Sequence, residues 1–211
     1  MRAWSLGALA LIVFAAPHDA TASQTVADDG PEALIERTVQ SLLDEFASER
    51  ERFADQRELF ALVDRVAVPL FDFERIAKLV LAKNWRNADD AQRAEFGDAF
   101  KKLLIGTYAT ALFQYTGDER MAFVGSEIIE RKGRQFAEVK SEVTLGVGAP
   151  AVPVDYSLIR GEDEQWRIYN LSINGLNMVA NYRSTYSASI DSLGLDGLIE
   201  SMQQSNARNN L

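Results

Sequence analysis

The apolar residues of this 211-residue chain change their spacing twice, and that change limits the possible folds more than any other feature. Between residues 31 and 115 they recur every three or four positions, which is the period of a helix. Between residues 121 and 173 they alternate with polar residues as in a strand, and from residue 175 the helical period returns. This order predicts an α+β fold: an antiparallel or mixed sheet with helices packed on one side.

Prolines and capping residues predict where the helices begin and end. Pro31 suits the first turn of one helix, and Pro69 interrupts a later one. Asp89 lies in a run of capping residues that predicts a long helix over residues 91–115. After the strands, we expect a helix from residue 175 to 190, and a short last one near residues 198–202.

The alternating segments predict four strands. They cover residues 121–130, 136–146, 152–158 and 165–175, with a hairpin turn at Gly133 between the first two. In the fourth segment the apolar phase slips from Trp166 and Ile168 to Tyr169, Leu171 and Ile173. A slip of one position predicts a β-bulge near Tyr169.

The first 22 residues have the three parts of a secretory signal peptide. A positive residue, Arg2, precedes an apolar run from Leu6 to Ala16, and a small-residue motif ends at Ala22. The apolar run is too short to span a bilayer, so we expect cleavage before Ser23. The exported chain then divides into a flexible segment over residues 23–30, a single domain over residues 31–205, and a frayed end over residues 206–211.

Charge and composition narrow the function. The net charge of −9 opposes binding to nucleic acid and stable insertion into anionic membranes. The chain has no cysteine, and its one histidine, His18, lies in the expected signal peptide. The exported protein therefore lacks the residues of Ser-His-Asp and Cys-His catalysis and of common zinc and haem sites. We expect no catalytic residues, no metal and no enzyme activity.

The polar residues that could carry chemistry each have an ordinary structural role. Asp72 and Glu74 do not share a helix face, and we favour Asp72 as a helix cap. Asp155 and Tyr156 are adjacent in a strand and point to opposite faces, so they cannot form a local pair. Arg183 could contact an anionic head group, although we favour an ion pair with a surface carboxylate.

The helices carry more apolar surface than a core requires. Over residues 73–80 the apolar side chains cover an arc of roughly 200°, about twice the face by which a surface helix seals itself to a core. The excess can be explained by a thick core, or by a cavity between sheet and helices that holds an apolar ligand.

Several short pieces recur in a characteristic order and spacing: Trp85-Arg86 with Gln92 and Phe96, Thr107-Tyr108-Ala109, Val154-Asp155-Tyr156, Trp166, Gly175 and Tyr182-Arg183. Together, from about Val63 to Met202, they resemble the MlaC or toluene-tolerance family of periplasmic phospholipid-binding proteins. One departure is Gly175-Leu176-Asn177, where many relatives carry Gly-Val-Ser; ligand contacts at Asn177 are therefore not carried over.

The resemblance implies a soluble periplasmic carrier in the system that maintains outer-membrane lipid asymmetry. It implies a nuclear-transport-factor-like fold and bound phospholipid as cargo, with no other cofactor. Its partners would be an inner-membrane ABC transporter complex with a substrate-binding ring subunit, and an outer-membrane lipoprotein–porin complex. We expect a monomer.

A carrier must enclose the lipid tails. Two acyl chains with about 30 methylenes cost on the order of 24 kcal/mol to hold in water, so a shallow groove is not enough. The expected pocket wall is Phe73, Ile76, Val80, Phe100, Leu104, Tyr108, Leu112, Val139, Val143, Val154, Tyr156, Ile173 and Val179, with Arg183 as the possible head-group contact. Alternatives are another apolar cargo such as a hopanoid or aromatic solvent, a small isomerase with an Asp base and a Tyr donor, and a purely structural role.

Overall fold

The computed structural model describes residues 30–144 and 148–209. The expected signal peptide and all but the last residue of the expected flexible segment lie outside these ranges. The helices are α1 (Pro31–Ser48), α2 (Gln56–Val66), α3 (Phe73–Leu81), α4 (Asp90–Tyr108) and α5 (Met178–Arg208), with short 3₁₀ helices η1 (Arg52–Ala54), η2 (Val68–Leu70), η3 (Asn84–Arg86) and η4 (Ala109–Gln114). The strands are β1 (Arg120–Arg131), β2 (Arg134–Thr144), β3 (Ala151–Arg160), β4 (Trp166–Ile173) and β5 (Leu176–Asn177).

The five strands form one open antiparallel sheet in the order β1-β2-β3-β4-β5, and the α+β prediction is confirmed. The hairpin between β1 and β2 turns at Lys132 and Gly133, both with positive φ. The predicted bulge is present: Asn170 pairs with Ser157 and Ile168 with Leu158, leaving Tyr169 as the extra residue of β4. The nuclear-transport-factor-like label remains a prediction.

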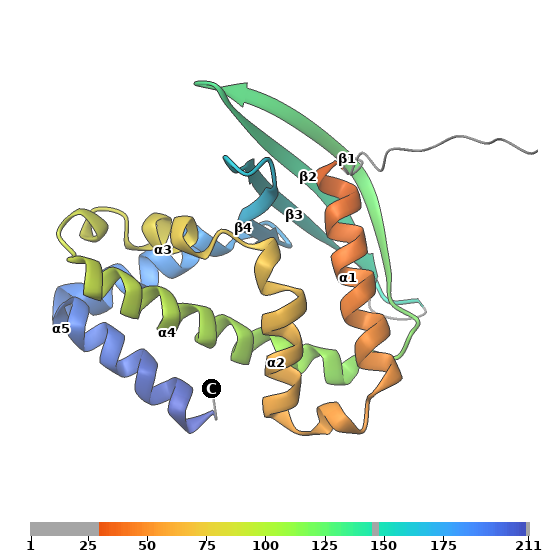
Figure 1. Ribbon diagram of the computed structural model, residues 1–211, viewed down its shortest axis with the longest axis horizontal. Coiled ribbons are helices and arrows are strands. Elements are labelled where there is room, and N and C mark those ends of the chain that lie inside the picture. Colours follow the sequence, from red (N-terminus) through yellow and green to blue (C-terminus); the bar gives the residue numbers. More distant parts are fainter. Residues whose placement is uncertain (1–29, 145–147, 210–211) are drawn as a thin grey trace, which may run out of the picture.

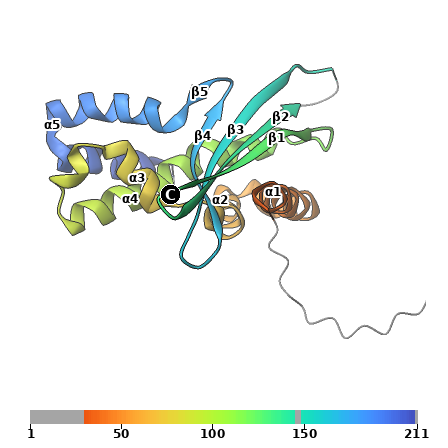
Figure 2. The same cartoon turned by 90° about the horizontal axis from the view of Figure 1, so that it is seen from above.

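The helices form two groups along the sheet. Figures 1 and 2 show α1 and α2 side by side at one end, with α3, α4 and α5 gathered at the other. The start of α3 is fixed to the sheet, because the Asp72 N–H donates to the carbonyl of Ile168 on β4 at 2.9 Å. Asp72 also caps α3 by accepting from the Arg75 N–H, as expected from the sequence.

Three apolar clusters surround the middle of the molecule. One joins α3, α4 and α5 around Phe96 and Phe100. A second lies between α1 and the sheet and contains Ile35, and a third joins α1, α2 and η4 around Phe46. Members of all three clusters, such as Phe100, Ile168 and Ile105, also border the cavity described below.

Two helix ends differ from the sequence prediction. The long helix expected over residues 91–115 is α-helical only to Tyr108 and continues as the 3₁₀ helix η4. Helix α5 continues to Arg208, although we expected fraying from residue 206. Asn206 is buried, and its amide Nδ2 donates to the carbonyl of Ala99 on α4 at 2.8 Å.

Helix α5 bends sharply at Gly194, which has φ 75° and ψ 171° and separates two helical arms. Beyond the bend, Leu198, Ile199 and Met202 are buried in the cluster with α3 and α4. The two helices predicted from the sequence therefore correspond to the two arms of α5, and the bend turns the second arm back onto the bundle.

Candidate functional site

A cavity of about 540 Å³ lies between the helices and the sheet. This is within the usual size range of small-molecule pockets, about 300–1,000 Å³. The sequence-predicted residues in its wall are Phe73, Ile76, Val80, Phe100, Leu104, Tyr108, Leu112, Val143 and Val179. Their part in ligand binding stays a prediction.

The surroundings of helix α3 account for its excess of apolar surface. Phe73, Ile76 and Val80 are spaced by three and four residues and line the cavity. Ala77 and Leu81 are buried in the cluster with α4 and α5. One broad apolar face thus serves both the core and the cavity.

Helix α4 and its 3₁₀ extension provide a continuous stripe of the wall. Phe100, Leu104 and Tyr108 follow one another at intervals of four, and Leu112 on η4 continues the line. The wall residues that are exposed are Tyr108, Ala111 and Gln114, all at the end of α4 or on η4. The cavity therefore reaches solvent along η4, and we call these three residues the rim.

The bulge in β4 brings consecutive residues to the cavity. Ile168, Tyr169, Asn170 and Leu171 all line the wall, although alternate residues of a regular strand face opposite sides. The side chain of Asn170 also accepts from the Val179 N–H at 3.3 Å. This hydrogen bond fixes the beginning of α5 over β4.

Sequence reasoning missed the contributions of α1, of α2 with its C-cap, and of the start of η2 to the wall. These are Val39, Leu42, Leu43, Val63, Ala67 and Val68. Their apolar periodicity was visible, but nothing separated them from residues such as Ile35 and Phe46 that fill the core. The other wall residues not singled out are Phe71, Ile105, Ala109, Ala111, Gln114, Tyr115, Glu119, Ile168, Tyr169, Asn170, Leu171, Met178 and Tyr182.

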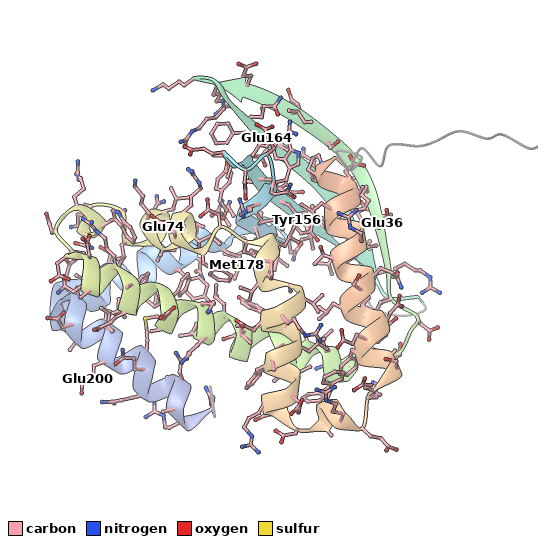
Figure 3. All side chains as sticks on the ribbon, viewed as in Figure 1. Glu36, Glu74, Tyr156, Glu164, Met178 and Glu200 are labelled. Carbon is pink, nitrogen blue, oxygen red and sulfur yellow. The ribbon has the colours of Figure 1, made fainter. Side chains whose placement is uncertain are left out.

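Four predicted wall residues do not line the cavity. Val139 is fully buried, and Val139, Val154 and Tyr156 pack in the cluster between α1 and the sheet. Ile173 pairs with Val154 and with Leu176 of β5. Helix α1 covers this part of the apolar sheet face, so the side chains meet a helix and not open space. Figure 3 shows Tyr156 toward α1 and Met178 toward the space among α2, α3 and α4, while Glu74 and Glu200 point outward.

Arg183 is outside the wall as well. Its side chain is exposed on α5, and Nε donates to the carbonyl of Leu79 in the last turn of α3 at 2.8 Å. A cation is favourable there because the carbonyls at a helix C-terminus carry partial negative charge. The interaction observed is therefore neither of the two roles considered from the sequence.

The few polar groups of the wall are tyrosine hydroxyls, Gln114, Asn170 and one carboxylate, Glu119. Desolvation raises the pKa of Tyr182, with a further contribution from its hydrogen bond to Tyr108, so this phenol remains neutral. Its ring packs edge-on against Phe100 with centroids 5.0 Å apart. The Tyr108 hydroxyl lies 3.9 Å from the Met178 sulfur. The interior is thus apolar and has little to bind a polar ligand.

Some features of other functional classes are not found in the described residues. Over residues 30–144 and 148–209, no three His, Cys, Asp or Glu side chains gather as metal ligands would. No helix in the same ranges has the length and hydropathy needed to cross a membrane.

An α+β fold around a large apolar cavity is typical of proteins that hold an apolar ligand. The sequence profile of the MlaC protein family matches residues 36–204, and the chain belongs to this family. It is 26% identical over 176 residues to the toluene tolerance protein ttg2D of Pseudomonas putida, a match covering 82% of this chain and 78% of that protein.

Two further relatives are a phospholipid transport protein and a solved structure. The chain is 20% identical over 182 residues to the intermembrane phospholipid transport system binding protein MlaC of Haemophilus influenzae, covering 85% of this chain and 84% of that one. It is also similar to the structure of a phospholipid-binding protein from Ralstonia solanacearum in complex with a phospholipid. That comparison gives a TM-score of 0.74 and 25% identity, and it covers 86% of this chain and 99% of the other.

Proposed function

We propose that this protein is a carrier that encloses the acyl chains of a phospholipid in the cavity and moves the lipid between membranes. The observation that carries this proposal is the cavity itself, about 540 Å³ with an almost entirely apolar wall. The phospholipid-binding protein of similar fold from Ralstonia solanacearum supports the choice of ligand.

The distribution of the wall residues over the helices favours a ligand with two acyl chains over a fused-ring ligand. One part of the wall belongs to α3, α4 and α5, and another belongs to α1, α2 and η4. Two flexible chains that diverge from one head group can fill both parts, whereas a rigid ring system such as a hopanoid requires one wide, flat space. Bound hopanoid would keep the carrier role and change its cargo.

An isomerase on the same fold is the second candidate, and the wall does not favour it. Such an enzyme requires a buried carboxylate of raised pKa. Desolvation raises the pKa of Glu119, but hydrogen bonds from the N–H groups of Thr116 and Gly117 lower it by more. The pKa of this carboxyl group is therefore below its usual range. Asp155 is outside the wall. In the register of the sheet it lies opposite Lys140 on β2 and Ser172 on β4.

Family membership and the N-terminal sequence support a proposal for the place of action. We place the carrier in the periplasm after export, as a monomer, in the system that maintains the lipid asymmetry of the outer membrane. It would exchange phospholipid with an inner-membrane ABC transporter complex and with an outer-membrane lipoprotein–porin complex. The acidic net charge of −9 suits a shuttle that docks with proteins and is repelled by anionic bilayers.

A blocked rim tests the proposal. Ala111 is an exposed wall residue on η4, so Ala111→Trp places an indole across the opening without disturbing the core. Losing even two buried methylenes, about 1.6 kcal/mol, lowers affinity more than about tenfold. We expect lipid-stripped Ala111→Trp to take up at least about tenfold less phospholipid from vesicles than the wild type.

The matched control is Thr107→Trp, which adds the same ring at an exposed position of α4 outside the wall. This variant should take up lipid normally. Normal uptake by folded Ala111→Trp would show that lipid does not enter through this cavity.

A further inference from the structure

Tyr108 is the one aromatic side chain of the rim. It is 44% exposed at the end of α4, and it lines the cavity four positions after Leu104. The other rim residues are Ala111, which has no polar side-chain atom, and Gln114. A lipid whose tails fill the cavity must leave its glycerol and phosphate groups at this opening. The Tyr108 phenol therefore lies where the apolar wall ends and solvent begins.

The Tyr108 hydroxyl has a proton to donate and only a weak acceptor for it. Within the described residues, the acceptor of this proton is the Met178 sulfur, 3.9 Å from the hydroxyl oxygen. A thioether sulfur is a weak acceptor, so little is lost when the hydroxyl donates to a ligand instead. Figure 3 shows Met178 toward the space among α2, α3 and α4, and both residues line the cavity.

A second phenol supports this arrangement. Tyr182 lines the same cavity on α5. Burial raises the pKa of Tyr182, and its hydrogen bond with Tyr108 raises it further. A hydrogen bond raises the pKa of a phenol when that phenol keeps its proton and donates it. The Tyr108 oxygen therefore accepts from Tyr182, and the proton of Tyr108 stays available to a ligand.

The charged side chains near the rim are bonded to the turn that follows η4. The Arg50 guanidinium donates to the carbonyls of residues 113 and 115, and the Arg120 guanidinium to those of residues 117 and 119. The Glu119 carboxylate accepts from the N–H groups of Thr116 and Gly117 and from the Thr116 hydroxyl. Neither arginine lines the cavity. The Tyr108 hydroxyl is thus a wall donor that is not already bonded to this turn.

We infer that the Tyr108 hydroxyl donates to a phosphate oxygen of the bound lipid, and so selects phospholipids over neutral diacylglycerols with the same tails. This inference rests on the proposed function. A hydrogen bond from a hydroxyl to an ionised oxygen is shorter and stronger than one to a neutral oxygen, so the phosphate is favoured over the ester carbonyls. The selection depends on the phosphate and not on the alcohol that is attached to it.

A competition between two lipids tests the inference. Lipid-stripped protein is equilibrated with phosphatidylcholine vesicles that contain diacylglycerol with the same tails, and the lipid bound to folded protein is quantified by mass spectrometry. The bound ratio of each variant is compared with that of the wild type, which cancels the different tendencies of the two lipids to leave the bilayer. We expect Tyr108→Phe to lower phosphatidylcholine relative to diacylglycerol by about three- to tenfold, the range of one hydrogen bond.

Tyr186→Phe is the matched control. It removes the same hydroxyl from a tyrosine of α5 that is buried in the cluster with α3 and α4 and does not line the cavity. Its bound ratio should equal that of the wild type. Because Tyr108→Phe keeps the aromatic ring, a change in its ratio reports the loss of the hydroxyl and not a loss of packing.

A second competition separates the phosphate from the ester carbonyls. Ether-linked phosphatidylcholine has the phosphate and lacks the carbonyls, so Tyr108→Phe should not change its bound ratio to the ester-linked lipid. Inorganic phosphate added in excess should leave the ratios unchanged, because it has no tails to hold it at the rim.

Each contrary result has its own meaning. An unchanged ratio of phosphatidylcholine to diacylglycerol in Tyr108→Phe, or an equal fall in Tyr186→Phe, would overturn the role of the Tyr108 hydroxyl and leave the carrier function intact. A shift of Tyr108→Phe toward the ether-linked lipid would overturn the phosphate as acceptor and assign the bond to an ester carbonyl. Ratios that change with inorganic phosphate would show that the hydroxyl binds free phosphate. Failure of the wild type to take up either lipid would overturn the carrier function and this inference together.

Discussion

Two apolar residues on well-defined elements show the difference between filling the core and lining the cavity. Val139 on β2 is fully buried between the sheet and α1. Leu104 on α4 is half-buried and borders the cavity. Shortening Val139 leaves a void in a closed cluster, whereas shortening Leu104 removes contact area from whatever fills the cavity.

Val139→Ala and Leu104→Ala should therefore have different effects. Val139→Ala should lower the free energy of unfolding by about 2 kcal/mol and leave the lipid content of each folded molecule unchanged. Leu104→Ala should release lipid to acceptor vesicles about three- to tenfold faster, because part of the area of three carbon atoms is lost from the contact. Chemical denaturation and lipid analysis of the folded fraction measure the two effects. Loss of lipid from folded Val139→Ala would contradict the assignment of the wall.

At the scale of elements, sequence patterns identified the apolar faces but not what lies opposite each face. Val139 and Val143 are four positions apart on the same face of β2, yet α1 covers the first and the cavity borders the second. On α1, Ile35 fills the core while Val39 lines the wall. Only the packing of α1 across the sheet separates these cases, and no local pattern records it.

Where the interactions that determine a feature are local in sequence, the prediction from sequence agreed better with the structure. The bulge at Tyr169 was predicted from a slip in apolar phase, and the cap at Asp72 from the residue type. The wall residues Phe73, Ile76 and Val80 were found because α3 has more apolar surface than one core contact requires. The buried amide of Asn206 was missed because its acceptor, the Ala99 carbonyl, is distant in sequence.

The bend in α5 gives a prediction at the same scale. Gly194 has φ 75° and ψ 171°, a combination that is available essentially only to glycine. Apart from its neighbours along the chain, no atom of the described residues lies within 4 Å of the position that a Cβ would take, so any effect of Gly194→Ala comes from backbone strain and not from a clash. We expect Gly194→Ala to lower the free energy of unfolding by about 1–3 kcal/mol, because the second arm loses its approach to α3 and α4.

Gly97→Ala on α4 is the control for this substitution. The space around its Cβ position is equally open, but residue 97 is in a helix interior with no positive φ. Alanine there should raise the free energy of unfolding by about 0.5–1 kcal/mol, as measured by thermal or chemical denaturation. An equal gain in stability from Gly194→Ala would show that the bend is not a conformational requirement.

At the scale of the whole molecule, three apolar clusters border one cavity. The net charge of −9 is carried almost entirely outside the cavity, where Glu119 is the one charged wall residue that the structure describes. An acidic exterior and an apolar interior that opens along η4 suit a protein that carries a lipid through water.

The central claim is that a phospholipid occupies this cavity. The most direct measurement is mass spectrometry of an organic extract from the protein, purified without detergent. The account predicts diacyl phospholipid in about one-to-one ratio with protein, and less of it in Ala111→Trp. An empty wild-type protein that also fails to take up lipid from vesicles would contradict the account.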